Sequence, residues 1–146
     1  MSVDVRTSTE IARPRSEVAA FAADPDNATH WYANIVEVTW ETPPPLAVGS
    51  RLSFVARFLG RKLAYTYEVV EHVPGERFVM QTAQGPFPMR TTYSWSDAPD
   101  GRTRMELHND GEPSGFVKVS APMMAGAMRR ANTKDLAALK QLLEQG

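Results

Sequence analysis

Three polar side chains fall at positions where the sequence pattern predicts apolar surroundings, and these are the best candidates for chemistry. Asn132 lies between Met128 and Leu136 on the apolar side of a predicted helix, and Tyr65 and Tyr67 share the inward face of a predicted strand. A buried amide or phenol needs a hydrogen-bond partner. That partner is either a ligand, whose carbonyl such a group could polarise, or another part of the protein. Both interpretations stay open for each residue.

Aromatic and methionine side chains accompany these three on the predicted inward faces. Methionine adapts to irregular apolar shapes and so suits a permissive pocket, although it also serves as filler in an ordinary core. Asn109 is in phase with inward Met105 and Leu107, so it either points toward a pocket mouth or starts the turn at Gly111. The predicted ligand-binding, pocket-lining set is Trp31, Phe54, Tyr65, Tyr67, Phe78, Met80, Met89, Tyr93, Trp95, Asn109, Met124, Met128 and Asn132.

The sequence does not identify a catalytic centre, and it predicts no metal site and no cofactor. There is no cysteine, which removes thiolate nucleophiles and disulfides, and the histidines His30, His72 and His108 have no metal-ligand spacing. The remaining inward carboxylate is Asp135, at the edge of the helical apolar arc. The catalytic residues, if the protein is an enzyme, are therefore unknown at this stage.

Composition predicts one globular domain over residues 1–146. The hydrophobic fraction is 42% and the charged fraction 23%, both ordinary for a globular protein, and a net charge of -1 argues against a nucleic-acid partner. No apolar run reaches the roughly 18 residues of a membrane-spanning helix, and the first residues do not resemble a signal peptide. We therefore expect a cytoplasmic protein without stable membrane insertion.

The elements that must position these side chains are mostly short strands. Val3–Ala12 is the first, and two short helices follow, the second over Asn27–Trp31. Alternating apolar residues and turn signals then predict six more strands. These are Ile35–Glu41, Arg51–Phe58, Lys62–His72, Arg77–Thr82, Phe87–Ser96 and Thr103–Asp110.

A long amphipathic helix completes the chain, with a shorter or bent entry segment expected from Ser114 and a straight run to Glu144. Pro122 should start or kink it, because proline donates no backbone hydrogen bond. Its apolar arc is interrupted only by Asn132 and consists of Met124, Met128, Leu136, Leu139 and Leu143. An antiparallel meander with one apolar face must wrap this helix, and a cavity between them is the expected consequence.

The chain resembles the START/Bet v 1-like superfamily (SRPBCC), in its bacterial polyketide cyclase/dehydrase-like branch. The matching stretches are Ile11-Ala-Arg-Pro-Arg-Ser-Glu-Val18, Pro25 with Trp31, Val48-Gly-Ser50, Tyr67-Glu-Val-Val-Glu71, Pro74-Gly-Glu-Arg-Phe78, Gly101-x-Thr103-x-Met105 and Asp135-Leu-x-x-Leu139-Lys-x-Leu-Leu-Glu144. The resemblance implies an α+β helix-grip fold, with a seven-stranded antiparallel sheet wrapped around the C-terminal helix and two short helices between the first two strands. It also implies an internal pocket, since members bind or transform lipids, sterols, polyketides and other apolar small molecules.

Three functions follow as hypotheses. The first is the binding of a hydrophobic, lipid- or polyketide-like small molecule in the internal cavity. The alternative is a polyketide cyclase/aromatase or dehydratase acting in the same pocket through Tyr65, Tyr67 or Asn132. The third is an interaction module, which predicts a filled core and an exposed apolar patch instead. A homodimer is left open.

Overall fold

The computed structural model describes residues 3–58, 60–84, 88–112 and 121–145. The elements follow in the order β1 (Val3–Ile11), α1 (Arg15–Ala23), η1 (Pro25–Asn27), α2 (Ala28–Trp31), β2 (Ile35–Trp40), β3 (Arg51–Phe58), β4 (Arg61–Val73), β5 (Arg77–Gln84), β6 (Met89–Ala98), η2 (Pro99–Gly101), β7 (Arg102–Gly111) and α3 (Ala121–Gln145). The predicted helix-grip fold is confirmed, and the strand ends agree to within two residues. The predicted start of the sixth strand, Phe87, lies outside the described residues.

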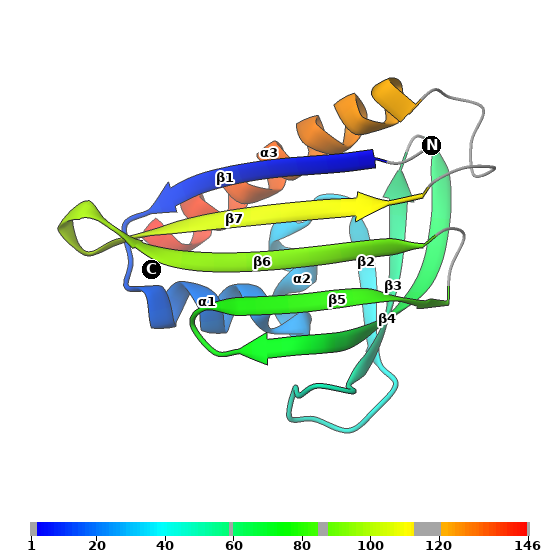
Figure 1. The fold of residues 1–146 in the computed structure, drawn as a ribbon, viewed down its shortest axis with the longest axis horizontal. Helices are drawn as coiled ribbons and strands as arrows, with labels where there is room; N and C mark the ends of the chain where they lie inside the picture. Colours follow the sequence, from blue (N-terminus) through cyan, green and yellow to red (C-terminus); the bar gives the residue numbers. More distant parts are fainter. Residues whose placement is uncertain (1–2, 59, 85–87, 113–120, 146) are drawn as a thin grey trace.

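The seven strands form one antiparallel sheet in the order β1-β7-β6-β5-β4-β3-β2. Strand β1 therefore pairs with β7, and the other neighbours are consecutive in the chain. The register of β4 against β5 shifts between Thr66 and Tyr67 and again between Val69 and Glu71. Such bulges bend a strand and increase its twist. Accordingly, Figure 1 shows β2 and β3 running steeply across the direction of β1, β7 and β6, so that the sheet curls around a central space.

The long helix α3 lies along β1 on the concave side of the sheet and also contacts α2 (Figure 1). It begins at Ala121, so Pro122 stands in its first turn, where proline is tolerated. The predicted entry segment from Ser114 lies in residues that the structure does not describe. The predicted apolar arc is buried, and Asn132 is buried within it at 6% exposure.

The end of α3 is fixed to the end of β1 by hydrogen bonds. The Ala12 amide donates to Glu144 Oε2 at 2.8 Å, and Lys140 Nζ donates to the Glu10 carbonyl oxygen at 2.7 Å. Lys140 Nζ also contacts Glu144 Oε2 at 2.9 Å. These contacts lower the pKa of Glu144, because they favour the ionised carboxylate. The helix is therefore held at this end independently of its middle.

The buried side chains form two clusters rather than one. The larger joins the sheet, α1, α2 and the last turns of α3, and the smaller joins Val3, Val5, Leu63, Met124 and Met128. Leu63 and Met128 of the smaller cluster line the same cavity as many residues of the larger one. The break in the hydrophobic core therefore coincides with the part of α3 that carries Asn132.

Candidate ligand-binding cavity

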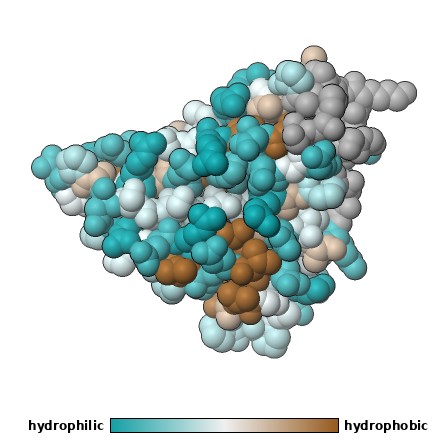
Figure 2. Space-filling model, viewed as in Figure 1, coloured by the Kyte–Doolittle hydropathy of each residue, from teal (hydrophilic) through white to brown (hydrophobic). Residues whose placement is uncertain are grey.

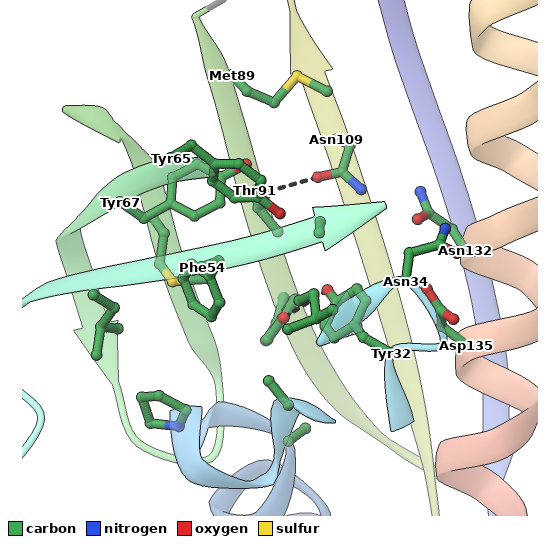
Figure 3. Close-up of a pocket in the computed structure, with 18 of the residues that line it drawn as sticks. Tyr32, Asn34, Phe54, Tyr65, Tyr67, Met89, Thr91, Asn109, Asn132 and Asp135 are labelled. Carbon is green, nitrogen blue, oxygen red and sulfur yellow. Dashed lines mark hydrogen bonds between the residues drawn. The ribbon is translucent and has the colours of Figure 1, made fainter. Parts of the chain in front are cut away.

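A cavity of about 150 Å³, partly open to the solvent, lies between the concave face of the sheet and the middle of α3. Its wall is mostly apolar, and Figure 3 shows the side chains that project into it from the strands, from α2 and from α3. An apolar cavity of about this size in another protein holds one benzene molecule. The space in this conformation therefore fits a single six-membered ring.

Aromatic side chains from β3 and β4 form the wall opposite α3. Phe54 pairs with Tyr65 across the two strands, and Leu52 pairs with Tyr67. Because side chains alternate along a strand, these residues all point to the same concave face. The ring centroids of Tyr65 and Tyr67 lie 5.2 Å apart, and those of Phe54 and Tyr65 lie 5.9 Å apart. The aromatic packing leaves little freedom on this side of the cavity.

A hydrogen-bonded chain on the sheet joins Tyr67, Thr91 and Asn109. Thr91 and Asn109 are directly paired between β6 and β7, and Thr91 Oγ1 donates to Asn109 Oδ1 at 2.6 Å (Figure 3). Since the single hydroxyl proton of Thr91 is used there, Tyr67 is the donor in its 3.2 Å contact with Thr91 Oγ1. Burial raises the pKa of Tyr67 to about 12, although the contact with Thr91 acts in the opposite direction. Tyr67 is therefore uncharged, with its proton already engaged.

Tyr65 differs from Tyr67 because its hydroxyl has no hydrogen-bond partner within the described residues. Burial, together with the neighbouring Tyr67, raises its pKa well above the usual value. The neutral hydroxyl of Tyr65 lies in the cavity wall, where it can donate to or accept from a bound molecule.

A second hydroxyl pair lies nearer to α3. The hydroxyl oxygens of Tyr32 and Tyr93 are 2.6 Å apart, so one donates to the other and one proton remains available. Burial is the main reason that the pKa values of both are raised, and the carboxylate of Asp135 raises both further. The two tyrosines are neutral groups that border the polar end of the cavity.

The polar end itself is built by α3 and by the connection between α2 and β2. The side chains of Asn34, Asn132 and Asp135 all point into this part of the cavity (Figure 3). The Asn132 Nδ2 group is buried and has no hydrogen-bond partner within the described residues. Asp135 is 2% exposed, and its Oδ1 accepts the Ala33 amide at 3.0 Å. Burial raises the pKa of Asp135 to about 6, because it outweighs the opposing effects of that hydrogen bond and of Lys134.

The whole of this architecture matches one known family. The family described as polyketide cyclase / dehydrase and lipid transport matches residues 2–144. The chain belongs to this family. No curated protein matches it in sequence.

Solved structures of several other proteins share the fold of this polyketide cyclase / dehydrase family member. A START superfamily protein from Mycobacterium smegmatis has a TM-score of 0.84 at 17% identity, with 97% of each chain covered. The Zhui aromatase/cyclase from Streptomyces sp. R1128 has a TM-score of 0.80 at 16% identity, covering 99% of this chain and 95% of that one. The di-domain ARO/CYC BexL has a TM-score of 0.74 at 18% identity, covering 97% of this chain and 46% of that one. At these identities the likeness concerns the fold.

Most of the side chains that the sequence predicts in the pocket of this family member do line the cavity. They are Phe54, Tyr65, Tyr67, Phe78, Met80, Met89, Tyr93, Asn109, Met128 and Asn132. Asn109 thus points inward and does not merely start a turn, and its Oδ1 is bonded to the sheet. Whether these residues bind a ligand stays a prediction.

Three predicted lining residues lie elsewhere. Trp31 is 2% exposed and packs behind the wall, with its ring 4.1 Å from that of Tyr32. Trp95 is buried under α1, and Met124 lies one turn before Met128, in the smaller cluster. The indole nitrogens of both tryptophans are buried without a hydrogen-bond partner in the described part of the chain. The inward direction was correct in each case, but the packing of neighbouring side chains separates these three from the cavity.

Six polar lining residues were absent from the predicted site: Asp24, Tyr32, Asn34, Thr82, Thr91 and Asp135. Thr91 could have been found, since it lies two residues before inward Tyr93 on the same strand. Asp135 also had a signal, because it follows Asn132 by three residues on a helix, although the sequence placed it only at the edge of the arc. Tyr32 and Asn34 had none, because they belong to an irregular connection whose path depends on the tertiary structure.

Proposed function

We propose that this family member binds a hydrophobic small molecule in the cavity between the sheet and α3. The observation that carries the proposal is a mostly apolar cavity whose wall contains a buried, unpaired amide group, the Asn132 Nδ2. A buried donor without a partner costs about 1–3 kcal/mol of stability, and Asn132 lines the cavity, unlike Trp31 and Trp95, whose indole nitrogens are also unpaired. A ligand that accepts its hydrogen bond provides a reason for this amide.

The size of the ligand follows from the cavity and from its movable walls. The present space of about 150 Å³ fits one ring, whereas pockets for drug-sized molecules usually measure about 300–1,000 Å³. Met80, Met89 and Met128 line the cavity, and methionine side chains rearrange readily. We therefore expect single-ring compounds to bind without rearrangement and two-ring compounds to require movement of these methionines.

The test is a titration of the purified protein with toluene and naphthalene, together with a variant that fills the cavity. Ala56 lines the cavity from β3, whereas Ala64 is exposed on the outer face of the neighbouring strand β4. We expect Ala56→Leu to weaken toluene binding by at least about tenfold and Ala64→Leu to leave it unchanged. Absence of toluene binding to the wild type, or equal binding to Ala56→Leu, would contradict the proposal. Native mass spectrometry of protein purified from its own host would reveal a co-purifying apolar ligand.

A second candidate function is the cyclisation of a polyketide-like chain, and the position of Asp135 favours it. Its carboxylate has a pKa of about 6 and shares the polar end of the cavity with the Asn132 amide. In this reaction Asp135 takes a proton from the carbon beside one carbonyl group, whose oxygen accepts a hydrogen bond from Asn132. The resulting carbanion bonds to a second carbonyl carbon of the same chain, and that oxygen takes the proton back from Asp135. Zhui, whose fold this chain shares, is named as an aromatase/cyclase.

Binding is the first proposal because the present cavity is too small for a chain that folds into several rings. For cyclisation, we expect Asp135→Asn to lower turnover of a short poly-β-ketone by at least about a hundredfold while toluene still binds. Unchanged turnover in Asp135→Asn would exclude this mechanism. Lost turnover together with lost toluene binding would instead point to a damaged cavity.

An interaction module is less well supported by the surface. The large hydrophobic side chains that are exposed in the described part of the chain are Val36 in β2, Val48 in the loop before β3, Val73 at the end of β4, and Met123 and Leu142 in the first and last turns of α3. Figure 2 shows this face of the molecule as largely hydrophilic, with one contiguous hydrophobic patch in its lower centre and a smaller one beside it. None of the described helices is long and apolar enough to cross a membrane. A cytoplasmic location, the lack of a nucleic-acid partner and a homodimer stay predictions.

A further inference from the structure

We propose that the cavity selects a neutral ring compound that carries a hydroxyl group, and that Asn132 and Asp135 bind this hydroxyl group together. The inference rests on the proposed binding function and specifies the chemical class of the ligand. Three separate features restrict the chemical class of the ligand: the hydrogen-bonding capacity of the polar end, the charge of the polar end, and the position of the aromatic wall.

The first constraint is that Asn132 presents an unpaired donor, and Asp135 an unpaired acceptor, at the polar end. Asn132 Nδ2 is buried without an acceptor within the described residues. Asp135 uses Oδ1 to accept the Ala33 amide, and no described group donates to its other oxygen, Oδ2. The two residues are three apart on α3, so their side chains project from one face of the helix. A hydroxyl oxygen accepts from Asn132 while its proton goes to Asp135, so a single group completes both hydrogen bonds.

The second constraint is charge. The charged side chains among the described lining residues are Asp24, which is exposed at the rim, and Asp135, and no Lys, Arg or His is among them. A carboxylate ligand would be repelled by Asp135 and would lose its hydration without gaining a cationic partner. The nearest base in the chain, Lys134, is exposed. Fatty acids and other anionic ligands are therefore disfavoured.

Two other ligand classes complete only part of the site. An ammonium group would pair with Asp135, but it has no lone pair for Asn132 Nδ2, which would stay unsatisfied. A hydrocarbon satisfies neither group. A ketone accepts from Asn132 and leaves Asp135 without a donor. The hydroxyl group is the smallest neutral group that satisfies both residues.

The third constraint is where the rest of the molecule goes. Figure 3 shows Phe54, Tyr65 and Tyr67 across the cavity from Asn132 and Asp135. A ligand whose hydroxyl group contacts α3 therefore directs its ring toward this aromatic wall. Phenol fits both the polar end and the volume, since the cavity holds about one ring.

The experiment compares four single-ring probes: toluene, phenol, benzylamine and benzoate. Their dissociation constants are measured by ligand-observed NMR at about pH 7.5, where Asp135 is ionised. We expect phenol to bind about tenfold more tightly than toluene, which corresponds to one well-placed hydrogen bond to a charged group. Benzylamine should bind more weakly than phenol, and benzoate should bind most weakly of the four. Tighter binding of benzoate or benzylamine than of phenol would overturn the selectivity.

Variants assign the preference to the two residues. Asn132→Leu and Asp135→Asn should each reduce the advantage of phenol over toluene to within about threefold, while toluene binding persists. Arg129→Gln removes an exposed charge from the same helix and should leave all four affinities unaltered.

The toluene measurement separates the two proposals. If toluene and phenol bind equally to the wild type, the hydroxyl preference is wrong and the binding function stands. If toluene does not bind to the wild type, the binding function itself fails.

Discussion

The substitution Asn132→Leu is expected to stabilise the protein, although it changes a buried side chain in the middle of the longest helix. Asn132 is 6% exposed and lies in an arc otherwise formed by Met124, Met128, Leu136 and Leu139. Its Nδ2 has no partner in the described part of the chain, so the substitution breaks no hydrogen bond of that group. Leucine also has the same branched arrangement of four side-chain heavy atoms as asparagine, and a higher helix propensity.

The expected gain is about 2 kcal/mol. Removing an unsatisfied buried donor is worth about 1–3 kcal/mol, and part of the leucine surface stays exposed to the cavity, so the transfer of its apolar area adds little. For a chain of this length each kcal/mol moves the melting temperature by roughly 2–4 °C, so we expect a rise of about 4–8 °C. The measurement is urea denaturation with a check that the slope m is unchanged, supported by calorimetry.

Asn109→Leu is the matched control, because Asn109 is also a buried asparagine of the cavity wall, at 8% exposure. Its Oδ1 accepts the 2.6 Å hydrogen bond from Thr91, so the substitution leaves the Thr91 hydroxyl proton without its acceptor. We expect a loss of about 2 kcal/mol. The same change at two buried asparagines should thus have opposite signs. A loss of about 1 kcal/mol or more in Asn132→Leu would show that its amide is satisfied in solution and would refute the reasoning.

Three further predictions concern Asp135, the tyrosines and one glycine. Because the pKa of Asp135 is raised from 3.8 to about 6 on folding, the folded state holds the proton longer, and stability should fall by about 1–3 kcal/mol between about pH 4 and pH 7. Asp135→Asn should remove this fall, and the difference between the two urea-denaturation series at each pH isolates it. Tyr67→Phe should cost about 1 kcal/mol through its lost hydrogen bond, whereas Tyr65→Phe should change stability by less than about 0.5 kcal/mol in the same assay. Gly111→Ala should lower the melting temperature by several degrees, since its new Cβ would collide with the Met89 side chain and the neighbouring backbone.

The sequence was sufficient for the fold because local patterns decide it. Alternation along strands such as Arg51–Phe58 identifies both the strand and its buried face, and the helical arc from Met124 to Leu143 identifies the face of α3 that packs on the sheet. Those patterns also place Asn132 inside the apolar arc. Each of these inferences needs only neighbouring residues in the chain.

The site was predicted less completely, because its geometry depends on pairs of residues far apart in the chain. Tyr32 meets Tyr93 through a contact between residues 61 positions apart, and Asp135 meets Ala33 across 102 positions. No periodic pattern encodes such contacts. Likewise, an inward direction on a strand did not separate Trp95, which packs under α1, from Tyr93, which reaches the cavity. The volume of the cavity is harder still to predict from the sequence, because it depends on the bulges that curl β4.

The contrast between the C-terminal end of α3 and its middle argues for a functional role of the middle. At the C-terminal end, polar groups are paired: Glu144 accepts from Ala12 and from Lys140. In the middle, the Asn132 amide and one Asp135 carboxylate oxygen have no partner within the described residues, although the other Asp135 oxygen accepts the Ala33 amide. A helix that served only to close the sheet would gain stability from leucine at position 132. If Asn132→Leu is more stable and binds phenol no better than toluene, the amide will have been shown to act on the ligand at the expense of the fold.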